Sequence, residues 1–431
     1  MLRTGIPTLG PATCPTPLAY GRFIDGDSQT CIRLGPDDIE EFEAEADVAF
    51  ERAGPRAKLF FEPSGVRAAI VTCGGLCPGL NDVIHAIVME CHHNYKVKET
   101  LGVRFGLQGF LPRYGHPMVE LTPAYVSTIH NTGGTVLGTS RGPQPVTEIV
   151  DALLAREINM LFVIGGEGTM KAAMKISDEV HKRRERIAVI GVPKTIDNDI
   201  NLVTSSFGFD TAVEKAAEAI RSAHTEAISV RNGIGLVKLM GREAGFIAAQ
   251  ATLALKEVNY VLVPEAAFAL HGDNGLLASL EARLKARDHA VIVVAEGAGQ
   301  NLLSEVDEFD ASGNRKLGDI AGLLMKEIGG YLKKREIPHS FKYIDPSYLI
   351  RSVPANANDR VYCGFLGQFA VHAAMAGKTE MVVSRLYDHY VHLPLPLVTQ
   401  RSKKLNLASA CWQSVLECTG QHHILIPKAC G

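Results

Sequence analysis

From residue 66 onward, short runs of apolar residues alternate with longer segments in which apolar and polar residues are mixed. The runs RAAIVT, MLFVIG, IAVIGV and AVIVVA are apolar at almost every position, and each ends in a glycine-rich or polar turn. Strands of this kind are buried on both faces, which is typical of parallel sheets. Mixed segments such as LNDVIHAIVMEC and EAGFIAAQATLAL fit helices that cover such sheets. The pattern predicts an α/β fold with two Rossmann-like lobes, each with a largely parallel sheet flanked by helices.

The first 65 residues follow a different pattern. Pro and Thr are frequent in MLRTGIPTLGPATCPTP, and acidic residues dominate DDIEEFEAEADVAF. The acidic stretch is compatible with a surface helix. It would belong either to a regulatory or oligomerisation arm or to a solvated extension, and we favour the solvated extension.

Composition limits the possible functions. The chain has 431 residues and 46% hydrophobic residues, which is enough for two lobes with large cores. A net charge of −3 argues against a nucleic-acid partner. The nine cysteines have the spacing of neither a zinc finger nor a disulfide framework. Without an apolar leader or a membrane-length apolar run, we expect a soluble, reduced, cytoplasmic protein with no membrane partner.

Two glycine-rich loops follow predicted strands, where ligands bind in such folds. The first is CGGLCPGLN, residues 73–81, whose glycines let a phosphate approach the backbone and the next helix N-terminus. An ordinary tight turn is the alternative. Cys73 and Cys77 have no matching second pair, which disfavours a metal. The second is GGEGT, residues 165–169, where Glu167 is suited to Mg²⁺ that bridges phosphate oxygens. Lys171 stands where a dinucleotide fingerprint needs glycine, which disfavours NAD.

A third loop, PKTIDNDI, follows the strand IAVIGV. In an extended chain Thr195, Asp197 and Asp199 point to the same side. A carboxylate there is placed to take a proton from an attacking hydroxyl, while Lys194 and Thr195 hold a moving phosphoryl group. The alternative is an Asx-rich turn that caps the next helix. Several arginines at strand ends also suggest a ligand with more than one phosphate.

The order of these motifs resembles the phosphofructokinase family. CGGLCPGLN, GGEGT, PKTIDNDI, MGRE and SYLIRSVPANANDR follow one another as in that family, from about residue 52 to the CTGQ at 418–421. The branch with plant and trypanosomatid ATP-dependent 6-phosphofructokinases is the most similar. The resemblance implies phosphoryl transfer from ATP to the 1-hydroxyl of fructose 6-phosphate, with Mg²⁺, in a homotetramer or homodimer.

The resemblance also implies a domain plan. Residues 1–65 form the extension, 66–208 the nucleotide-binding lobe and 209–351 the sugar-phosphate lobe. Residues 352–431 supply C-terminal helices that pack back on the lobes, plus an extension. The active site would be the cleft between the lobes.

Residue roles carry over by matching motifs. Asp197 resembles the catalytic base, Asp199 would assist near the metal, and Thr195 would contact the transferring phosphate, with Lys194 beside it. The residues implied to bind the sugar phosphate are Met240, Gly241, Arg242, Glu296, Lys342, Tyr348 and Arg351, and Arg242 is also counted as catalytic. The residues implied to line the donor site are Gly74, Arg141, Gly142, Gly166, Glu167, Gly168 and Thr169, with Glu167 on Mg²⁺.

Some positions depart from the family pattern. Glu167 replaces the usual Asp, and Tyr348 stands where many bacterial members have His. Gly233 and Lys342 occupy the places of arginines that those members lend across a subunit interface. The subunit contacts near the 6-phosphate are therefore expected to differ from those of the bacterial enzymes.

Two positions bear on the choice between ATP and pyrophosphate. Pyrophosphate-dependent members usually have Asp at the place of Gly168, where a side chain would crowd the α-phosphate of ATP. Lys194 favours the opposite choice, because pyrophosphate enzymes carry Lys there, although the plant-like branch has both Gly and Lys. We favour ATP and keep pyrophosphate as the alternative. Two other classes are disfavoured by the intact PKTIDND and MGR motifs: an NAD or lipid kinase, and a non-catalytic sugar-phosphate sensor.

Overall fold

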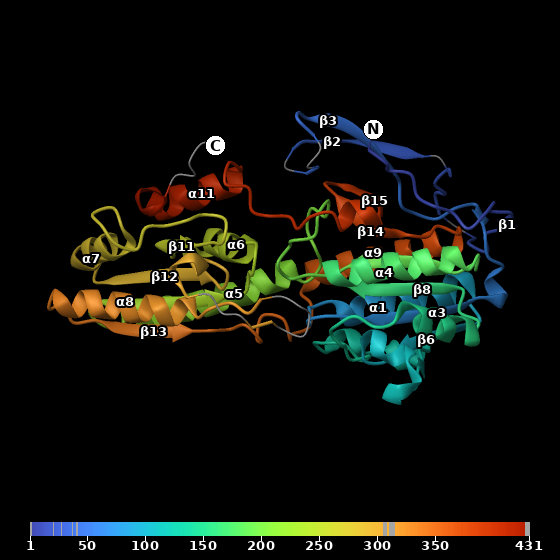
Figure 1. Cartoon of the computed structure of the whole chain (residues 1–431), viewed down its shortest axis with the longest axis horizontal. Helices are drawn as coiled ribbons and strands as arrows, with labels where there is room; N and C mark the ends of the chain where they lie inside the picture. The colour runs from blue at the N-terminus through green and yellow to red at the C-terminus, as the bar shows by residue number, and fades with distance from the viewer. Residues whose placement is uncertain are drawn as a thin grey trace. The chain divides into compact units, whose positions relative to one another are not determined.

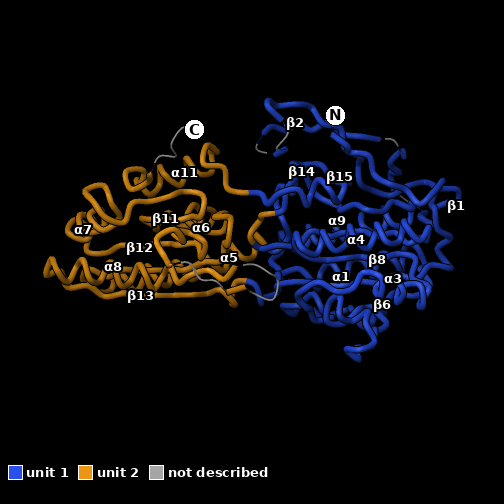
Figure 2. Tube along the Cα trace, in the orientation of Figure 1, with its two compact units in different colours: residues 1–196, 200–208, 351–403 blue, residues 197–199, 209–350, 404–431 orange. Residues whose placement is uncertain are grey.

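The computed structural model describes residues 2–19, 21–26, 28–36, 38–39, 42–304, 308–309 and 315–426. The chain divides into two compact units, which Figure 2 shows in different colours. Unit 1 consists of Met1–Ile196, Ile200–Gly208 and Arg351–Lys403, and unit 2 of Asp197–Asp199, Phe209–Ile350 and Lys404–Gly431. Within the described ranges, none of the helices combines the length and apolar character needed to cross a lipid bilayer.

Unit 1 is built on a seven-stranded sheet with the order β15-β14-β9-β8-β5-β6-β7. The five inner strands run parallel, whereas β15 and β7 at the two edges are antiparallel to their neighbours. Their bounds are β5 Arg67–Thr72, β6 Glu99–Val103, β7 Val119–Glu120, β8 Met160–Gly165, β9 Ala188–Pro193, β14 Met381–Leu386 and β15 His389–Pro394. Every residue of β8 and β9 is buried, as the uninterrupted apolar runs predicted.

Two pairs of helices pack around this sheet (Figure 1). Helix α1 (Leu80–Met89) packs on α9 (Ala357–Met375), and α3 (Val146–Ala155) packs on α4 (Glu167–Lys182). Shorter elements are α2 Pro123–Val126, α10 Leu395–Val398, the π-helix Glu90–Tyr95 that continues α1, and 3₁₀ turns at Pro63–Gly65, Gly106–Phe110, Pro112–Tyr114 and Ile129–Asn131. Helices α4 and α9 both contact the sheet at strands β8 and β9, which are buried throughout.

Unit 2 has a smaller parallel sheet of four strands with the order β11-β12-β10-β13. The strands are β10 Gly233–Leu239, β11 Tyr260–Leu262, β12 His289–Ala295 and β13 Ser340–Ile344. The helices are α5 Phe209–Ile228, α6 Phe246–Leu255, α7 Leu276–Arg287, α8 Ile320–Lys334 and α11 Ala410–Thr419, with 3₁₀ turns at Gln300–Leu302 and Gln421–Ile424. The predicted α/β class with largely parallel, helix-flanked sheets is confirmed.

The N-terminal region is not a solvated extension, and that prediction was wrong. Strand β2 (Gln29–Leu34) pairs with β3 (Ala46–Glu51), and β1 (Cys14–Pro15) pairs with β4 (Lys58–Leu59). The surface helix considered for residues 37–50 is absent from the described part of that stretch, which leads into strand β3; residues 37, 40 and 41 lie outside the described residues. In ADVAFE, Val48 and Phe50 are buried and alternate with the more exposed Asp47, Ala49 and Glu51, as in a half-buried strand. Phe50 is fully buried and belongs to the main core of unit 1.

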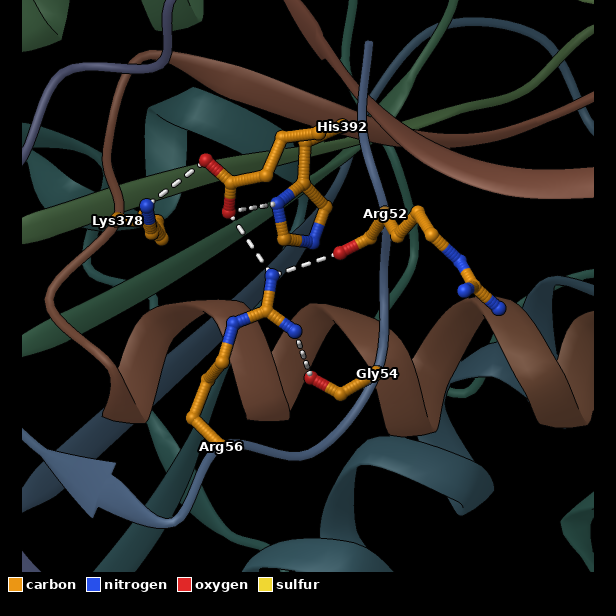
Figure 3. A network of polar contacts seen from close by, with 6 residues as sticks. Arg52, Gly54, Arg56, Lys378 and His392 are labelled. Atoms are coloured by element: carbon orange, nitrogen blue, oxygen red, sulfur yellow. Dashed lines mark hydrogen bonds and ion pairs between the residues drawn. The ribbon is translucent and has the colours of Figure 1, made fainter. Parts of the chain in front are cut away.

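A buried polar network ties this region to the large sheet (Figure 3). The carboxylate of Glu51 accepts hydrogen bonds from Arg56 Nη2 at 3.0 Å, Lys378 Nζ at 2.8 Å and His392 Nδ1 at 3.0 Å. Arg56 also donates to the carbonyls of Arg52 and Gly54. Burial raises the pKa of Glu51, but the bonds from His392 and Lys378 outweigh it and lower the pKa to about 2. Glu51 is thus a fixed negative charge at the centre of the network.

The C-terminal region contains more than helices. Strands β14 and β15 form a hairpin at the edge of the large sheet, and the apolar pattern did not predict them. The hairpin turn is Tyr387–Asp388, and Tyr387 has a φ of 53°. Two-residue hairpin turns usually reveal themselves by Asn-Gly or Asp-Gly, so this sequence lacks the usual signal.

Candidate active site

Three neighbouring strands of unit 1 deliver their loops to the same edge of the sheet. Strands β5, β8 and β9 are adjacent and parallel, and they end just before Cys73, Gly166 and Lys194. Backbone bonds join the loops where they leave the strands: Cys73 N donates to Ile164 O, and Lys194 N donates to Gly165 O. The two glycine-rich loops and the start of PKTIDNDI therefore lie together, as expected for the carboxyl ends of parallel strands.

Three cationic side chains converge on the first glycine-rich loop. Lys194 is 5% exposed, and its Nζ donates to the carbonyl of Gly75 at 2.6 Å. A Cβ atom placed on Gly75 would lie 3.4 Å from Nη1 of Arg351 and 3.8 Å from Nη2 of Arg141, and one on Gly74 would lie 3.6 Å from Nζ of Lys194. Positive charge beside glycines, with no side chain between, is suited to phosphate groups.

Hydrogen bonds explain how Arg141 reaches this place. The loop TSRGP lies against Gly74, because Thr139 Oγ1 donates to Gly74 O at 2.8 Å and Gly74 N donates to Ser140 O at 3.2 Å. Gly74 has a φ of 83°, a conformation that side chains rarely adopt. Arg351 follows the segment SYLI and reaches the same loop. The resemblance assigned Arg141 to the donor and Arg351 to the sugar phosphate, whereas unit 1 brings the two guanidinium groups to one loop.

Glu167 is the first residue of α4, and its two carboxylate oxygens have different partners. Oε1 accepts Lys171 Nζ at 2.5 Å, one helical turn along α4, and Oε2 accepts Ser402 Oγ at 2.7 Å. Burial raises the pKa of Glu167, but the bonds from Lys171 and Ser402 prevail and lower it. Motif reasoning missed both partners as members of the site. The (i, i+4) spacing was a usable signal for Lys171, whereas nothing in the sequence connects Ser402 with a residue 235 positions earlier.

The donor set at Glu167 fits Mg²⁺ held jointly with a ligand. Mg²⁺ is commonly bound by one or two carboxylates, waters and substrate phosphates rather than by an all-protein cage. Glu167 supplies one ionised carboxylate at a glycine-rich helix N-terminus. Across the described part of the chain, no group of three or more His, Cys, Asp or Glu side chains could hold a metal by itself. The remaining ligands of a metal at Glu167 would therefore come from phosphates and water.

The glycines of the second loop differ in the space around them. A Cβ atom on Gly168 would have no atom within 4 Å, whereas one on Gly165 would lie 2.4 Å from Oγ1 of Thr169. A Cβ atom on Gly166 would lie 3.4 Å from the carbonyl oxygen of Lys194. Gly165 is thus required by packing, while Gly168 borders open space that a ligand can use.

The segment PKTIDNDI is bent rather than straight. Lys194 bridges to Phe207, the carbonyl of Thr195 accepts Ser206 Oγ at 2.6 Å, and Asn198 has a φ of 56°. Exposure still alternates: the half-buried residues are Thr195, Asp197 and Asp199, and the buried ones are Ile196, Asn198 and Ile200. The three polar candidates are therefore partly accessible, while their neighbours anchor the loop. Asp197–Asp199 are counted with unit 2.

In unit 2 the ends of β10 and β12 bring two candidates together. Gly297 N donates to Gly241 O at 3.1 Å, and a Cβ atom on Gly297 would lie 1.8 Å from the carbonyl oxygen of Arg242. Gly297 must therefore be glycine for the two loops to touch. This contact places Glu296 beside the Met240–Arg242 segment, and the role of these residues in sugar-phosphate binding stays a prediction.

The other sugar-phosphate candidates lie apart from that contact or have other partners. Lys342 Nζ is 3.5 Å from a carboxylate oxygen of Glu226, and Tyr348 is 74% exposed. Gly233 is tightly packed, because a Cβ atom there would lie 2.1 Å from Ala227 O. An arginine at this position would displace the backbone of α5. The bacterial interface arginine therefore has no structural equivalent at residue 233.

Comparison with known proteins agrees with the motifs. The phosphofructokinase family model matches residues 67–374, which is more than half of the chain. An ATP-dependent 6-phosphofructokinase of Borreliella burgdorferi is 49% identical over 382 residues, covering 87% of this chain and 86% of the relative. ATP-dependent 6-phosphofructokinase 7 of Arabidopsis thaliana is 47% identical, covering 88% and 79%. The enzyme of Trypanosoma cruzi is 44% identical, covering 86% and 76%. The chain therefore belongs to the phosphofructokinase family.

Solved structures support the fold. A pyrophosphate-dependent phosphofructokinase from Marinobacter aquaeolei superposes with a TM-score of 0.68 at 22% identity, covering 85% of this chain and 94% of that one. At this identity the likeness concerns the fold alone. The pyrophosphate dependence of that enzyme is therefore no evidence for the phosphoryl donor of this chain.

Proposed function

We propose that this protein is an ATP-dependent 6-phosphofructokinase. It transfers the γ-phosphoryl group of ATP to the 1-hydroxyl of fructose 6-phosphate and forms fructose 1,6-bisphosphate and ADP. The structural observation that carries the proposal is the convergence of Lys194, Arg141 and Arg351 on the Gly74–Gly75 loop. A polyphosphate needs several cations around accessible backbone, and relatives with this activity supply the identity of the acceptor.

The donor residues have separate tasks in this proposal. Lys194, Arg141 and Arg351 bind phosphate oxygens and neutralise charge that develops during transfer. Gly142, Gly166 and Thr169 line the same loops. Glu167 would hold Mg²⁺, which, when bound to the donor phosphates, withdraws negative charge from the transferring group.

The acceptor residues supply the proton transfer and the sugar contacts. Asp197 takes the proton of the 1-hydroxyl as that oxygen attacks, which is how a carboxylate acts as general base. Asp199 and Thr195 orient the phosphoryl group, and Arg242 assists them. Met240, Gly241 and Glu296 hold the sugar, with Lys342 and Tyr348 toward its 6-phosphate.

Gly168 supports ATP as the donor. No atom lies within 4 Å of a Cβ placed on Gly168, so the position leaves space beside the proposed α-phosphate of ATP. Lys194 serves either donor, because its ammonium group lies at the loop that would bind any phosphate. Pyrophosphate is therefore the second candidate. We also propose that the chain works in the cytoplasm as a homotetramer or homodimer.

The test is fructose 1,6-bisphosphate formation by the purified protein with fructose 6-phosphate, Mg²⁺ and either ATP or pyrophosphate. We expect product with ATP and a loss of about 10²-fold or more in kcat for Asp197→Asn, in the range of general-base catalysis. Product formed with pyrophosphate but not with ATP would show that pyrophosphate is the donor. Binding of fructose 6-phosphate without turnover from either donor would make the protein a sensor.

A further inference from the structure

A short segment near the end of unit 1 is bonded to other parts of that unit, among them residue 36 and residues 200–203. We call residues Thr399–Lys403 the strap. Arg401 Nη2 donates to Pro36 O at 3.2 Å, and Ser402 bridges to Ile200 in the backbone. Lys403 Nζ donates to the carbonyl of Val203 at 2.5 Å. The strap therefore has a defined position relative to the segment that follows PKTIDNDI.

The hydroxyl of Ser402 connects the strap to the carboxylate that would hold the metal. Its Oγ donates to Oε2 of Glu167 at 2.7 Å in a partly buried place. The backbone of Ser402 is fixed at the same time by its bridge to Ile200. One residue thus joins the start of α4 to Ile200, the last residue of PKTIDNDI.

The two partners of Glu167 differ in what they can fix. Lys171 lies on the same helix, its side chain is 49% exposed, and an exposed (i, i+4) pair is weak. Lys171 can therefore release Oε1 when a cation approaches. Ser402 lies on a segment outside α4, so its bond fixes the position of Oε2 relative to the rest of unit 1.

We infer that Ser402 is a positioning residue for the metal-binding carboxylate, an inference that rests on the proposed function. A glutamate has one more rotatable bond than the aspartate usual at this place, so its carboxylate has more orientations to lose before it binds a metal. The bond from Ser402 selects one of them. Oε1 would then be the oxygen that holds the metal once Lys171 releases it.

The experiment measures metal binding directly. The dissociation constant of Mn²⁺ is determined by electron paramagnetic resonance for the full chain with a non-hydrolysable ATP analogue, with the analogue alone as background. Loss of a hydrogen bond to a metal ligand typically weakens metal affinity by about 10-fold or more. We expect that weakening for Ser402→Ala and near wild-type affinity for Ser402→Thr, which keeps the hydroxyl.

Comparing the Mg²⁺ dependence with kcat and KM, together with a control variant, separates positioning from a general structural effect. For Ser402→Ala, the Mg²⁺ concentration for half-maximal rate should rise, saturating Mg²⁺ should restore most of kcat, and the KM for fructose 6-phosphate should stay constant. Ser127→Ala removes the same atom from an exposed serine of unit 1 whose hydroxyl donates to Ala124 O within its own turn. It should change none of these values.

The outcomes distinguish this inference from the proposed function. Wild-type Mn²⁺ affinity in Ser402→Ala, with an active wild-type enzyme, overturns the role of Ser402 and leaves the proposed function intact. Equal weakening in Ser402→Thr and Ser402→Ala also overturns it, because the hydroxyl would not be the cause. A wild-type protein that binds no Mn²⁺ with the analogue overturns both.

Discussion

Two clusters of cationic side chains in unit 1 are built around different centres. In the N-terminal network, Arg56 and Lys378 converge on the carboxylate of Glu51. In the candidate active site, Lys194 and the two arginines converge on the Gly74–Gly75 loop, whose residues have no side chain. A carboxylate at the centre neutralises its partners and makes a structural clamp. Glycine at the centre leaves room for a ligand beside these cations.

Removing the carboxylate should break the clamp and produce the largest effect. Glu51→Ala leaves Arg56 and Lys378 buried without their negative partner, so we expect a loss of about 3 kcal/mol in the free energy of unfolding. Denaturant unfolding measures it. Glu45→Ala is the control, because Glu45 pairs with Arg33 and both side chains are 65% exposed. This variant should lose less than about 0.5 kcal/mol in the free energy of unfolding. Equal costs would show that burial of the network contributes nothing.

Adding a carboxylate to the active-site cluster should turn it into a clamp. Gly75→Asp places a negative charge beside Arg351 and Arg141 without severe overlap, since the nearest atoms lie 3.4 Å from the new Cβ. We expect kcat/KM for ATP to fall about 100-fold, or ~2.7 kcal/mol, with stability unchanged or raised. Gly75→Asn is the isosteric, uncharged control and should lose much less. Identical losses in both variants would mean that shape rather than charge matters there.

A carboxylate in the second glycine-rich loop, outside the cationic cluster, should have a smaller effect. It tests whether Gly168 determines the choice between ATP and pyrophosphate. Gly168→Asp adds a carboxylate in open space, and we expect kcat/KM for ATP to fall about 10-fold through repulsion of the α-phosphate. Gly330→Asp, at another helical glycine with no atom within 4 Å of the new Cβ, is the matched control. Unchanged ATP kinetics in Gly168→Asp would remove the steric and electrostatic basis for donor selection.

Acid should destabilise unit 1, in part through the clamp. The bonds from His392 and Lys378 outweigh burial and lower the pKa of Glu51 to about 2. His372 lies on α9 outside the Glu51 network, with its ring bonded to the hydroxyl of Tyr95, and burial lowers its pKa to about 3. A pKa that is lower in the folded state stabilises the protein above the unfolded value, and that stability is lost as pH falls. The contribution of His372 to stability is therefore lost as the pH falls from about 6.5 to 3, and that of Glu51 is lost as the pH falls from about 4.5 to 2.

Thermal unfolding between pH 7 and 4 measures this loss. We expect the wild type to lose on the order of 1 kcal/mol or more over that range. His372→Gln should lose less over the same range, because glutamine does not titrate. A variant with the wild-type pH dependence would contradict the role of His372.

The sequence predicted those parts of the molecule whose pattern is local. Uninterrupted apolar runs located β5, β8, β9 and β12, and the motifs at their ends located the loops of the site. The N-terminal hairpin was missed because its acidic residues hid the alternation of Val48 and Phe50. Contacts between distant segments have no local signal. Ser402 beside Glu167, and Arg351 beside Gly75, became visible only in the folded chain.

The central claim is that this chain uses ATP to phosphorylate fructose 6-phosphate. The most direct measurement supplies ATP and pyrophosphate together at equal concentration with Mg²⁺ and fructose 6-phosphate, and quantifies ADP, orthophosphate and fructose 1,6-bisphosphate. The account predicts one ADP for each fructose 1,6-bisphosphate and no orthophosphate above background. Orthophosphate formed in step with fructose 1,6-bisphosphate, without ADP, would contradict it.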